Sequence, residues 1–245
     1  MISVGINPFQ SCPINFINVS IDNPAYAQID GVLYNKQQKM LVVYPAAKEG
    51  AYSIPEGIVR IGEYAFYRCS GLTGITLPDS LITIGTSAFS GCSGLTGITL
   101  PDGLTSIGDF VFSRCSSVTS ITLPDSLTSI DDFAFSGCKS LRSITLPDGL
   151  KRIGNYAFTG CSSLAGIILP EGLISIGTEI FFFCEGLTRV TLPESLTSIG
   201  ESAFERTSDK LILSVVEGSY AEEYAMAHGL VYGYTTDTSW LQAGP

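Results

Sequence analysis

The sequence predicts a solenoid, a fold in which short units of equal length stack into one elongated domain. A segment of 23 residues recurs with little change and without insertions. A proline marks the same place in each copy: Pro55, Pro78, Pro101, Pro124, Pro147, Pro170 and Pro193. Six residues after each proline stands an isoleucine, and eleven after it a phenylalanine: Phe66, Phe89, Phe112, Phe135, Phe158, Phe181 and Phe204. A fixed period in the twenties is typical of stacked repeats.

Within one repeat, the residues Ile75–Thr76–Leu77 alternate between apolar and polar, which predicts a short strand with two side chains inward and one outward. The proline that follows ends this strand, because it cannot donate a hydrogen bond to a neighbouring strand. Pro-Asp-Ser or Pro-Asp-Gly then turns the chain. One repeat buries too little apolar surface to offset its loss of chain entropy. Only a stack, of about eight coils here, is therefore expected to be stable.

Two unlike segments precede the regular array, which we expect to span residues 51–215. Residues 1–22 resemble a partial or degenerate repeat, in which Phe16, Val19 and Ile21 replace the strand and Cys12 aligns with Cys69. The chain thus opens partway through a coil, from which we expect a missing upstream portion. Residues 23–50 predict a β-hairpin insertion that bulges from one coil, with strands at 29–34 and 40–44.

A cap is predicted to follow the array over residues 216–234. Ser219 and Glu222 have the spacing of a capping box, and Gly229 stands where a helix would stop. We therefore expect a helix over 220–228 that covers the open end of the stack, then a closing strand over 230–232. Residues 235–245 are expected to form a tail.

The repeat resembles a known family in detail. The run Leu72-x-x-Ile75-x-Leu77-Pro78-x-x-Leu81-x-x-Ile84-Gly85-x-x-Ala88-Phe89-x-x-Cys92 is similar to the BspA-type leucine-rich repeat of bacterial and protist surface proteins. The resemblance of the repeats covers roughly residues 54–215. The Asn-Pro-x-Tyr segment that begins at Asn23 adds to it, because BspA-type arrays often carry a similar insertion. The resemblance implies a mostly β leucine-rich repeat solenoid, displayed on a cell surface and adhering to host or neighbouring-cell proteins. Commoner leucine-rich repeats place Asn or Cys after the strand, so no asparagine ladder is expected here.

Composition narrows the class of partner. The formal net charge of -10 argues against nucleic acid or an anionic membrane. No run of 18 apolar residues occurs, so nothing is expected to span a bilayer. The first residues lack the basic start and long apolar core of a signal peptide. The chain is therefore either cytoplasmic or a piece of a longer exported protein, and the family resemblance favours the cell surface.

Seven cysteines align in one column, namely Cys12, Cys69, Cys92, Cys115, Cys138, Cys161 and Cys184. Successive coils about 4.8 Å apart would bring them within disulfide range. Side chains in register point the same way, however, so we expect buried, unpaired thiols rather than bridges. Zinc is disfavoured, because no Cys-x-x-Cys or histidine pair accompanies them.

An acidic residue follows each repeat proline, forming a second column that we name the carboxylate file: Glu56, Asp79, Asp102, Asp125, Asp148, Glu171 and Glu194. One interpretation is that these are polar turn residues. The alternative is a stripe that attracts a basic partner or Ca²⁺, and the weak metal candidates are Asp79, Asp102, Asp125 and Asp148. We expect no metal and no cofactor.

The outward face of the main strands forms a third column of small residues, mostly threonine, glycine and serine. Such a broad surface suits a protein or glycan better than a small substrate. Departures from the repeat are the places where a specific site could arise, although each could equally reflect surface variation or packing between coils. The candidate binding residues are Phe182, Phe183, Arg189, Ile168, Thr145, Thr122 and Arg142.

Catalysis has little support, because His228 is the only histidine and no nucleophile elbow, phosphate loop or zinc-binding helix occurs. The sequence therefore predicts a non-catalytic, adhesion-type module that binds a protein, such as a host extracellular-matrix or cell-surface protein. A passive stalk or spacer in a larger surface protein, or an intracellular scaffold, remains the alternative. The oligomeric state is left open.

Overall fold

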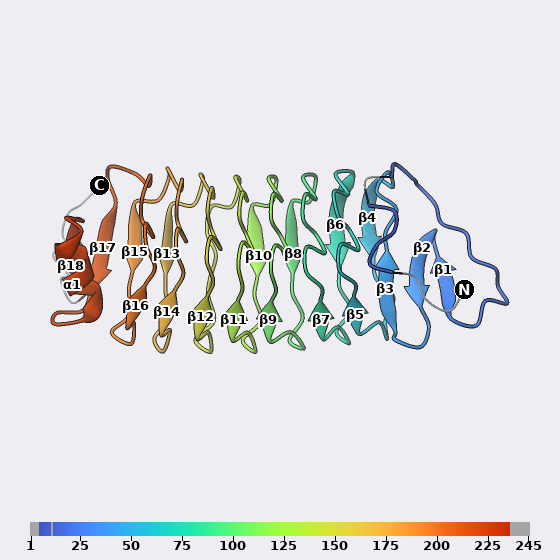
Figure 1. Cartoon of the computed structure of the whole chain (residues 1–245), viewed down its shortest axis with the longest axis horizontal. Helices are drawn as coiled ribbons and strands as arrows, with labels where there is room; N and C mark the ends of the chain where they lie inside the picture. Colours follow the sequence, from blue (N-terminus) through green and yellow to red (C-terminus); the bar gives the residue numbers. More distant parts are fainter. Residues whose placement is uncertain (1–4, 11, 236–245) are drawn as a thin grey trace.

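Each 23-residue unit makes one turn of a rod and places strands on two opposite sides of it (Figure 1). The computed structural model describes residues 5–10 and 12–235. The coils stack along the long axis of the molecule, with β1 (Tyr26–Ile29) near one end of the rod and helix α1 (Tyr220–Ala227) at the other (Figure 1). The predicted solenoid is therefore confirmed.

The upper strands in Figure 1 come just before the repeat prolines, except for β17, which follows the last of them. They are β4 (Gly50–Ser53), β6 (Leu72–Thr76), β8 (Gly97–Thr99), β10 (Ser120–Thr122), β13 (Gly166–Ile168), β15 (Arg189–Thr191) and β17 (Ile212–Val215). The lower strands, which the sequence analysis did not predict, end on the repeat isoleucine. They are β5 (Arg60–Ile61), β7 (Thr83–Ile84), β9 (Ser106–Ile107), β11 (Ser129–Ile130), β12 (Arg152–Ile153), β14 (Ser175–Ile176) and β16 (Ser198–Ile199).

Equal coil length keeps these strands in register. Ile130 lies opposite Ile107 on one side and opposite Ile153 on the other, in parallel pairs. Among the lower strands, β9 to β16 form one sheet and β5 and β7 belong to another, while the upper strands are divided among three sheets. Residues 141–147, between β10 and β13, form no strand. The upper sheet therefore resumes at β13 as a separate unit that continues through β15 and β17 to β18 (Tyr232–Tyr234).

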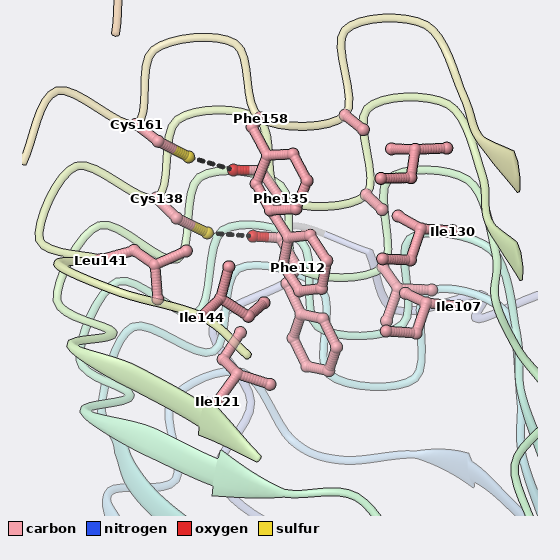
Figure 2. Packing of buried hydrophobic residues seen from close by; sticks show 14 of the residues in the cluster. Ile107, Phe112, Ile121, Ile130, Phe135, Cys138, Leu141, Ile144, Phe158 and Cys161 are labelled. Carbon is pink, nitrogen blue, oxygen red and sulfur yellow. Dashed lines mark hydrogen bonds between the residues drawn. The ribbon is translucent and has the colours of Figure 1, made fainter. Parts of the chain in front are cut away.

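The repeat phenylalanines stack along the centre of the rod. Phe112 and Phe135 have ring centroids 5.7 Å apart, and Phe135 and Phe158 are 5.2 Å apart, with nearly parallel planes (Figure 2). At the N-terminal end, Tyr44 stacks on Phe66 at 4.9 Å and so adds one more ring to the column. Since neighbouring aromatic rings and the isoleucines beside them are buried, this column is the core of every coil.

Six of the cysteines are buried and unpaired, as predicted, and each donates its thiol hydrogen to a backbone carbonyl. The Sγ of Cys138 lies 3.2 Å from the carbonyl oxygen of Phe112, and that of Cys161 lies 3.2 Å from the oxygen of Phe135 (Figure 2). Cys12 does not continue the column, because its side chain is exposed. Its assignment to the buried file was therefore wrong.

The N-terminal end departs from the expectation in two ways. The run 29–34 is not one strand, because Asp30 and Gly31 adopt positive φ angles and turn the chain between β1 (Tyr26–Ile29) and β2 (Val32–Asn35). β2 pairs antiparallel with β3 (Met40–Val43), and β3 pairs in parallel with β5. The predicted hairpin is thus present, but it extends the end of the stack instead of bulging from a coil (Figure 1).

The segment before this hairpin forms no strand within the described residues 5–10 and 12–22. Ile21 is 91% exposed and Phe16 is 55% exposed, so neither replaces a strand residue of the core. Phe16 covers Gly31 instead, where an added Cβ would meet its ring at 2.5 Å. The expectation that Phe16, Val19 and Ile21 stand in for a strand was therefore wrong.

The C-terminal cap is helix α1 (Tyr220–Ala227), which ends one residue before the predicted limit. The Ser219 hydroxyl accepts a hydrogen bond from the Glu222 backbone N–H, as a capping residue does. The closing strand lies at Tyr232–Tyr234 rather than 230–232, because the N–H of Leu230 still bonds to the carbonyl of Ala225 in a helix-ending motif. Of the predicted tail, residues 236–245 lie outside the described residues.

Candidate protein-binding groove

A groove of about 840 Å³ lies on the outward face of the upper sheet. It runs across the strands, from the coil at Ile144–Asp148 over β13, β15 and β17 to the residues of β18. The strands are short and parallel, so alternate residues of each point to the same face. The exposed part of the groove is therefore built from outward residues that repeat coil after coil, and the edges of the core residues Ile144, Leu146 and Ile167 complete its lining.

Strand register defines two rows on its floor. Gly166 lies opposite Arg189, which lies opposite Ile212. In the second row, Ile168 pairs with Thr191, Thr191 with Ser214, and Ser214 with Gly233. These residues come from four segments that are 19 to 23 residues apart in the sequence. Only the equal length of the coils brings them side by side.

Glycine makes the C-terminal part of the groove deep. Gly233 has no atom within 4 Å of the position that a Cβ would occupy, so the space above it is open. At Gly166 a Cβ would approach the carbonyl oxygen of Arg189 to 3.3 Å, which leaves little room. A side chain introduced at Gly233 would therefore fill the groove without disturbing the backbone.

Large apolar side chains break the run of small residues in this part of the face. Ile168 takes the place that threonine holds in neighbouring coils, and its side chain is 70% exposed. Ile212 stands in the column of glycine and serine and is 39% exposed. Burial of one such side chain by a partner is worth about 2 kcal/mol. The groove therefore offers apolar surface that a partner could cover.

A hydrogen bond to the cap holds the C-terminal wall of the groove. The hydroxyl of Tyr234 donates to the carboxylate of Glu222 at 2.6 Å, and the backbone N–H of Gly218 donates to the same group at 2.7 Å. These bonds stabilise the charged carboxylate and lower the pKa of Glu222. Donation to the carboxylate also raises the pKa of Tyr234 to about 12. Tyr234, in this wall, is thus attached to helix α1 by a hydrogen bond.

The predicted binding residues fall into separate places. Thr145, Ile168 and Arg189 line the groove together. Thr122, in β10, and Arg142 are exposed but do not line it. Phe182 and Phe183 also lie outside the groove, in the turn that follows β14. The structure therefore brings three of the seven candidates into one site.

The two phenylalanines form a compact cluster with a residue of the next coil. Their rings meet edge to face with centroids 4.4 Å apart, and the guanidinium of Arg206 lies 5.2 Å from the ring centre of Phe183. Phe183 has a φ of 58°, a left-handed conformation that glycine adopts at the same place in three other repeats. A bulky side chain in this conformation is uncommon, and Phe183 remains 42% exposed. The cation–π contact of Arg206 offsets part of that cost.

The carboxylate file lies on the turns beside the groove, and all seven of its side chains are exposed. Asp148 lines the groove itself. Among residues 5–10 and 12–235, no three His, Cys, Asp or Glu side chains come close enough to hold a metal ion. The weak metal candidates Asp79, Asp102, Asp125 and Asp148 are therefore separate carboxylates on successive coils.

Five groove residues were missed in the sequence: Ile212, Ser214, Gly233, Tyr234 and Thr235. Ile212 lies one repeat after Arg189, so extending the period past the last proline would have found it. Gly233 and Tyr234 follow the helix, where the constant period no longer applies. No signal in the sequence relates them to the face.

These features define a repeat protein of the leucine-rich type, with a continuous core and an open strand face. The sequence matches the family model of the BspA type leucine rich repeat region, in six copies over residues 50–138 and 105–218. The chain therefore belongs to the BspA-type leucine-rich repeat family. No match was found among curated proteins.

Solved structures agree with this assignment. A leucine-rich repeat protein from Eubacterium ventriosum ATCC 27560 is 30% identical, with a TM-score of 0.75 over 80% of this chain and 53% of that one. One from Bacteroides ovatus ATCC 8483 is 26% identical, with a TM-score of 0.55 over 89% of this chain and 68% of that one. The pneumococcal vaccine antigen PcpA, 20% identical with a TM-score of 0.57 over 89% of this chain and 49% of that one, shares the fold. The chain spans about half the length of the Eubacterium protein.

Proposed function

We propose that this chain is a non-catalytic protein-binding module of a cell-surface protein, and that its partner binds in the groove on the strand face. The observation that carries the proposal is the exposed Ile168 at the centre of that groove, in a column where threonine is usual. A solvated strand face does not need a large apolar side chain. A partner that covers it removes apolar surface from water.

The chemistry of the lining supports binding rather than catalysis. Its titratable side chains are Asp148, Arg189 and Tyr234. The Tyr234 hydroxyl already donates a hydrogen bond to Glu222, and the pKa of this hydroxyl is raised to about 12. This set contains no histidine and no pair of carboxylates, the groups that most often act as general acid and base. Threonine, serine and glycine supply shape and backbone contacts instead.

The proposed location rests on the family resemblance of the repeat. Proteins with BspA-type repeats are expected on bacterial or protist surfaces, where a module of this kind would adhere to host or neighbouring-cell proteins. No helix in residues 5–10 and 12–235 is long and apolar enough to cross a membrane. The larger protein of which such a module is a part would supply the attachment.

The test is binding of the purified chain to a panel of immobilised extracellular-matrix and cell-surface proteins, compared between two variants. Ile168→Asp places a charge at the centre of the groove, and Thr99→Asp places the same charge on the same face outside it. We expect Ile168→Asp to weaken binding by tenfold or more, which corresponds to about 1.4 kcal/mol. Thr99→Asp should change it less than about twofold. Equal affinity of all three proteins would overturn the groove as the binding site, and no binding by any would favour a passive stalk.

We propose Phe182 and Phe183 as a second, separate contact region. The pair is adjacent, and Phe183 is part-exposed in a conformation that suits glycine better. Replacing both by alanine should reduce binding to the same panel while the melting temperature stays within a few degrees. Unchanged binding would assign the pair to packing against Arg206 alone.

A further inference from the structure

We infer, on the basis of the proposed function, that the partner presents an amphipathic basic helix. This helix lies along the rod axis, with its apolar ridge in the groove and its basic ridge over the carboxylate file. Three observations carry the inference: exposed carboxylates along one side of the groove, the spacing between them, and their distance from the exposed isoleucines.

Three exposed carboxylates of the carboxylate file lie along one side of the groove. Asp148 lines the groove, and Glu171 and Glu194 occupy the same position on the next two coils. All three are exposed, and none forms an ion pair in the described part of the chain. The formal net charge of -10 makes the whole rod attractive to a basic partner. A basic ridge therefore finds three exposed carboxylates on this side.

The spacing of these charges favours a helix. Neighbouring parallel strands lie about 4.8 Å apart, and the carboxylates repeat with the coils. Residues that recur every three or four positions on a helix rise about 5.3 Å per step. Alternate residues of an extended strand are about 6.7 Å apart, so they lose register within two coils. A helix can therefore place a basic residue near each of three successive carboxylates.

The distance between the exposed isoleucine and the carboxylate beside it also fits the diameter of a helix. Ile168 and Glu171 are three residues apart around a proline turn, or about 10 Å if extended. This is close to the diameter of a helix with its side chains. Along the axis, the groove crosses four coil steps, or about 19 Å, which equals about 13 helical residues. One helix of that length would cover both Ile168 and Ile212.

Two cationic side chains, Lys151 and Arg189, lie at or near the groove. Lys151 has its ammonium group close to Gly172, 2.9 Å from the position of an added Cβ, and thus near the carboxylate file. Arg189 lines the floor on the far side of Ile168. Removal of Lys151 should strengthen the attraction of the file for a basic ridge.

The test uses a fluorescent amphipathic peptide of about 14 residues, with leucine on one ridge and lysine on the adjacent one. A second peptide carries glutamate in place of every lysine. Binding is measured by anisotropy at low and physiological salt to the intact chain and five variants.

One triple variant, D148N/E171Q/E194Q, removes the charge beside the groove, and its matched control, E56Q/D79N/D102N, removes the same charge far from it. Gly233→Leu fills the groove, with Gly74→Leu as its control on the same face, and Lys151→Gln removes the nearby cation.

We expect the lysine peptide to bind at least tenfold tighter than the glutamate peptide and to weaken as salt rises. The triple variant beside the groove and Gly233→Leu should each weaken it tenfold or more, while both controls stay within about twofold. Lys151→Gln should tighten binding.

Equal affinity for both peptides, or equal loss in the two triple variants, would overturn the inference. If those results occur while Ile168→Asp still abolishes binding to the matrix panel, the proposed function stands and only the partner chemistry is wrong.

Discussion

At the scale of the residue, the stack depends on a carbonyl group shared between two coils. The carbonyl oxygen of Phe112 accepts a hydrogen bond from the N–H of Cys115 in its own coil and another from the thiol of Cys138 in the next. The cysteine therefore does more than fill space, because it satisfies a buried acceptor that belongs to its neighbour. This contact recurs from Cys92 to Cys184 at 3.0 to 3.2 Å.

Burial makes six of the seven thiols unreactive. Desolvation disfavours the thiolate and raises the pKa of Cys69, Cys115 and Cys184 to about 12. Titration of the native chain with an aromatic disulfide reagent at pH 8 should therefore show one fast thiol, the exposed Cys12, and seven after denaturation. A chain in which several thiols react at once would contradict the buried column.

Tyr44 carries a buried hydroxyl that has no hydrogen-bond partner within the described residues. It occupies the phenylalanine column, where it stacks on Phe66. Tyr44→Phe should therefore raise the free energy of unfolding by about 1 kcal/mol, because a desolvated polar group is removed and the ring stays. The control is Tyr52→Phe, which removes a hydroxyl bonded to Tyr34 and should lower stability. Chemical denaturation of both variants measures the difference, and the opposite order would refute the assignment.

At the scale of the element, the C-terminal cap is held by one carboxylate. Glu222 is 9% exposed and accepts hydrogen bonds from Gly218 and Tyr234, which join the helix start to the last strand. Sequence spacing predicted that this side chain would close a capping box with Ser219. In the structure its two oxygens bond to the residue before Ser219 and to β18 instead.

Acid should weaken this cap. The folded pKa of Glu222 lies below its ordinary value of 4.5, so its stabilising effect is complete above about pH 4.5 and is lost as pH falls through the folded pKa. Glu222→Gln should therefore melt below the unaltered chain at pH 7, and the gap should close as the pH is lowered toward 3. Glu223→Gln removes a charge from the same helical turn and should show no such gap. Equal melting of the two variants across this range would argue against the carboxylate as the link.

Elements with the constant period could be predicted from the sequence, and those without it could not. The column positions of Phe135 and Cys138 follow from spacing alone, because the ring of Phe135 stacks on that of Phe112 and the thiol of Cys138 bonds to the carbonyl of Phe112, one coil earlier. The division of the run 29–34 at Asp30–Gly31 depends on turn geometry, for which this dipeptide is the local signal. The lower strands were missed because each is only two residues long and shows no alternation.

The candidate site, too, could be predicted only where its residues belong to the repeat. Thr145, Ile168 and Arg189 were selected as outward residues of the repeat, and they line one groove. The other wall comes from β18, whose position depends on how helix α1 ends, and no repeat relates Tyr234 to Ser214. Phe182 and Phe183 depart from the repeat as clearly as Ile168 does, yet they face a different part of the coil.

At the scale of the whole molecule, the protein is a row of nearly identical units whose stability comes from contacts between neighbours. The main core is one continuous cluster from Val32 to Ala225, and a smaller cluster of five buried residues lies at the N-terminal hairpin. In such an array the loss of one internal unit joins two others that fit each other equally well. A loss of part of a unit leaves every later side chain out of register.

Deletion of one repeat therefore tests the account most directly. Removal of residues 101–123 takes out 23 residues and joins Leu100 to Pro124, whereas removal of 101–112 takes out only part of a coil. Thermal unfolding followed by circular dichroism should show a cooperative transition for the larger deletion, which should also keep the groove at 144–235 and its peptide binding. The smaller deletion should unfold broadly or aggregate. If the smaller deletion were tolerated as well as the larger, or if the larger abolished cooperative unfolding, the in-register stack would be contradicted.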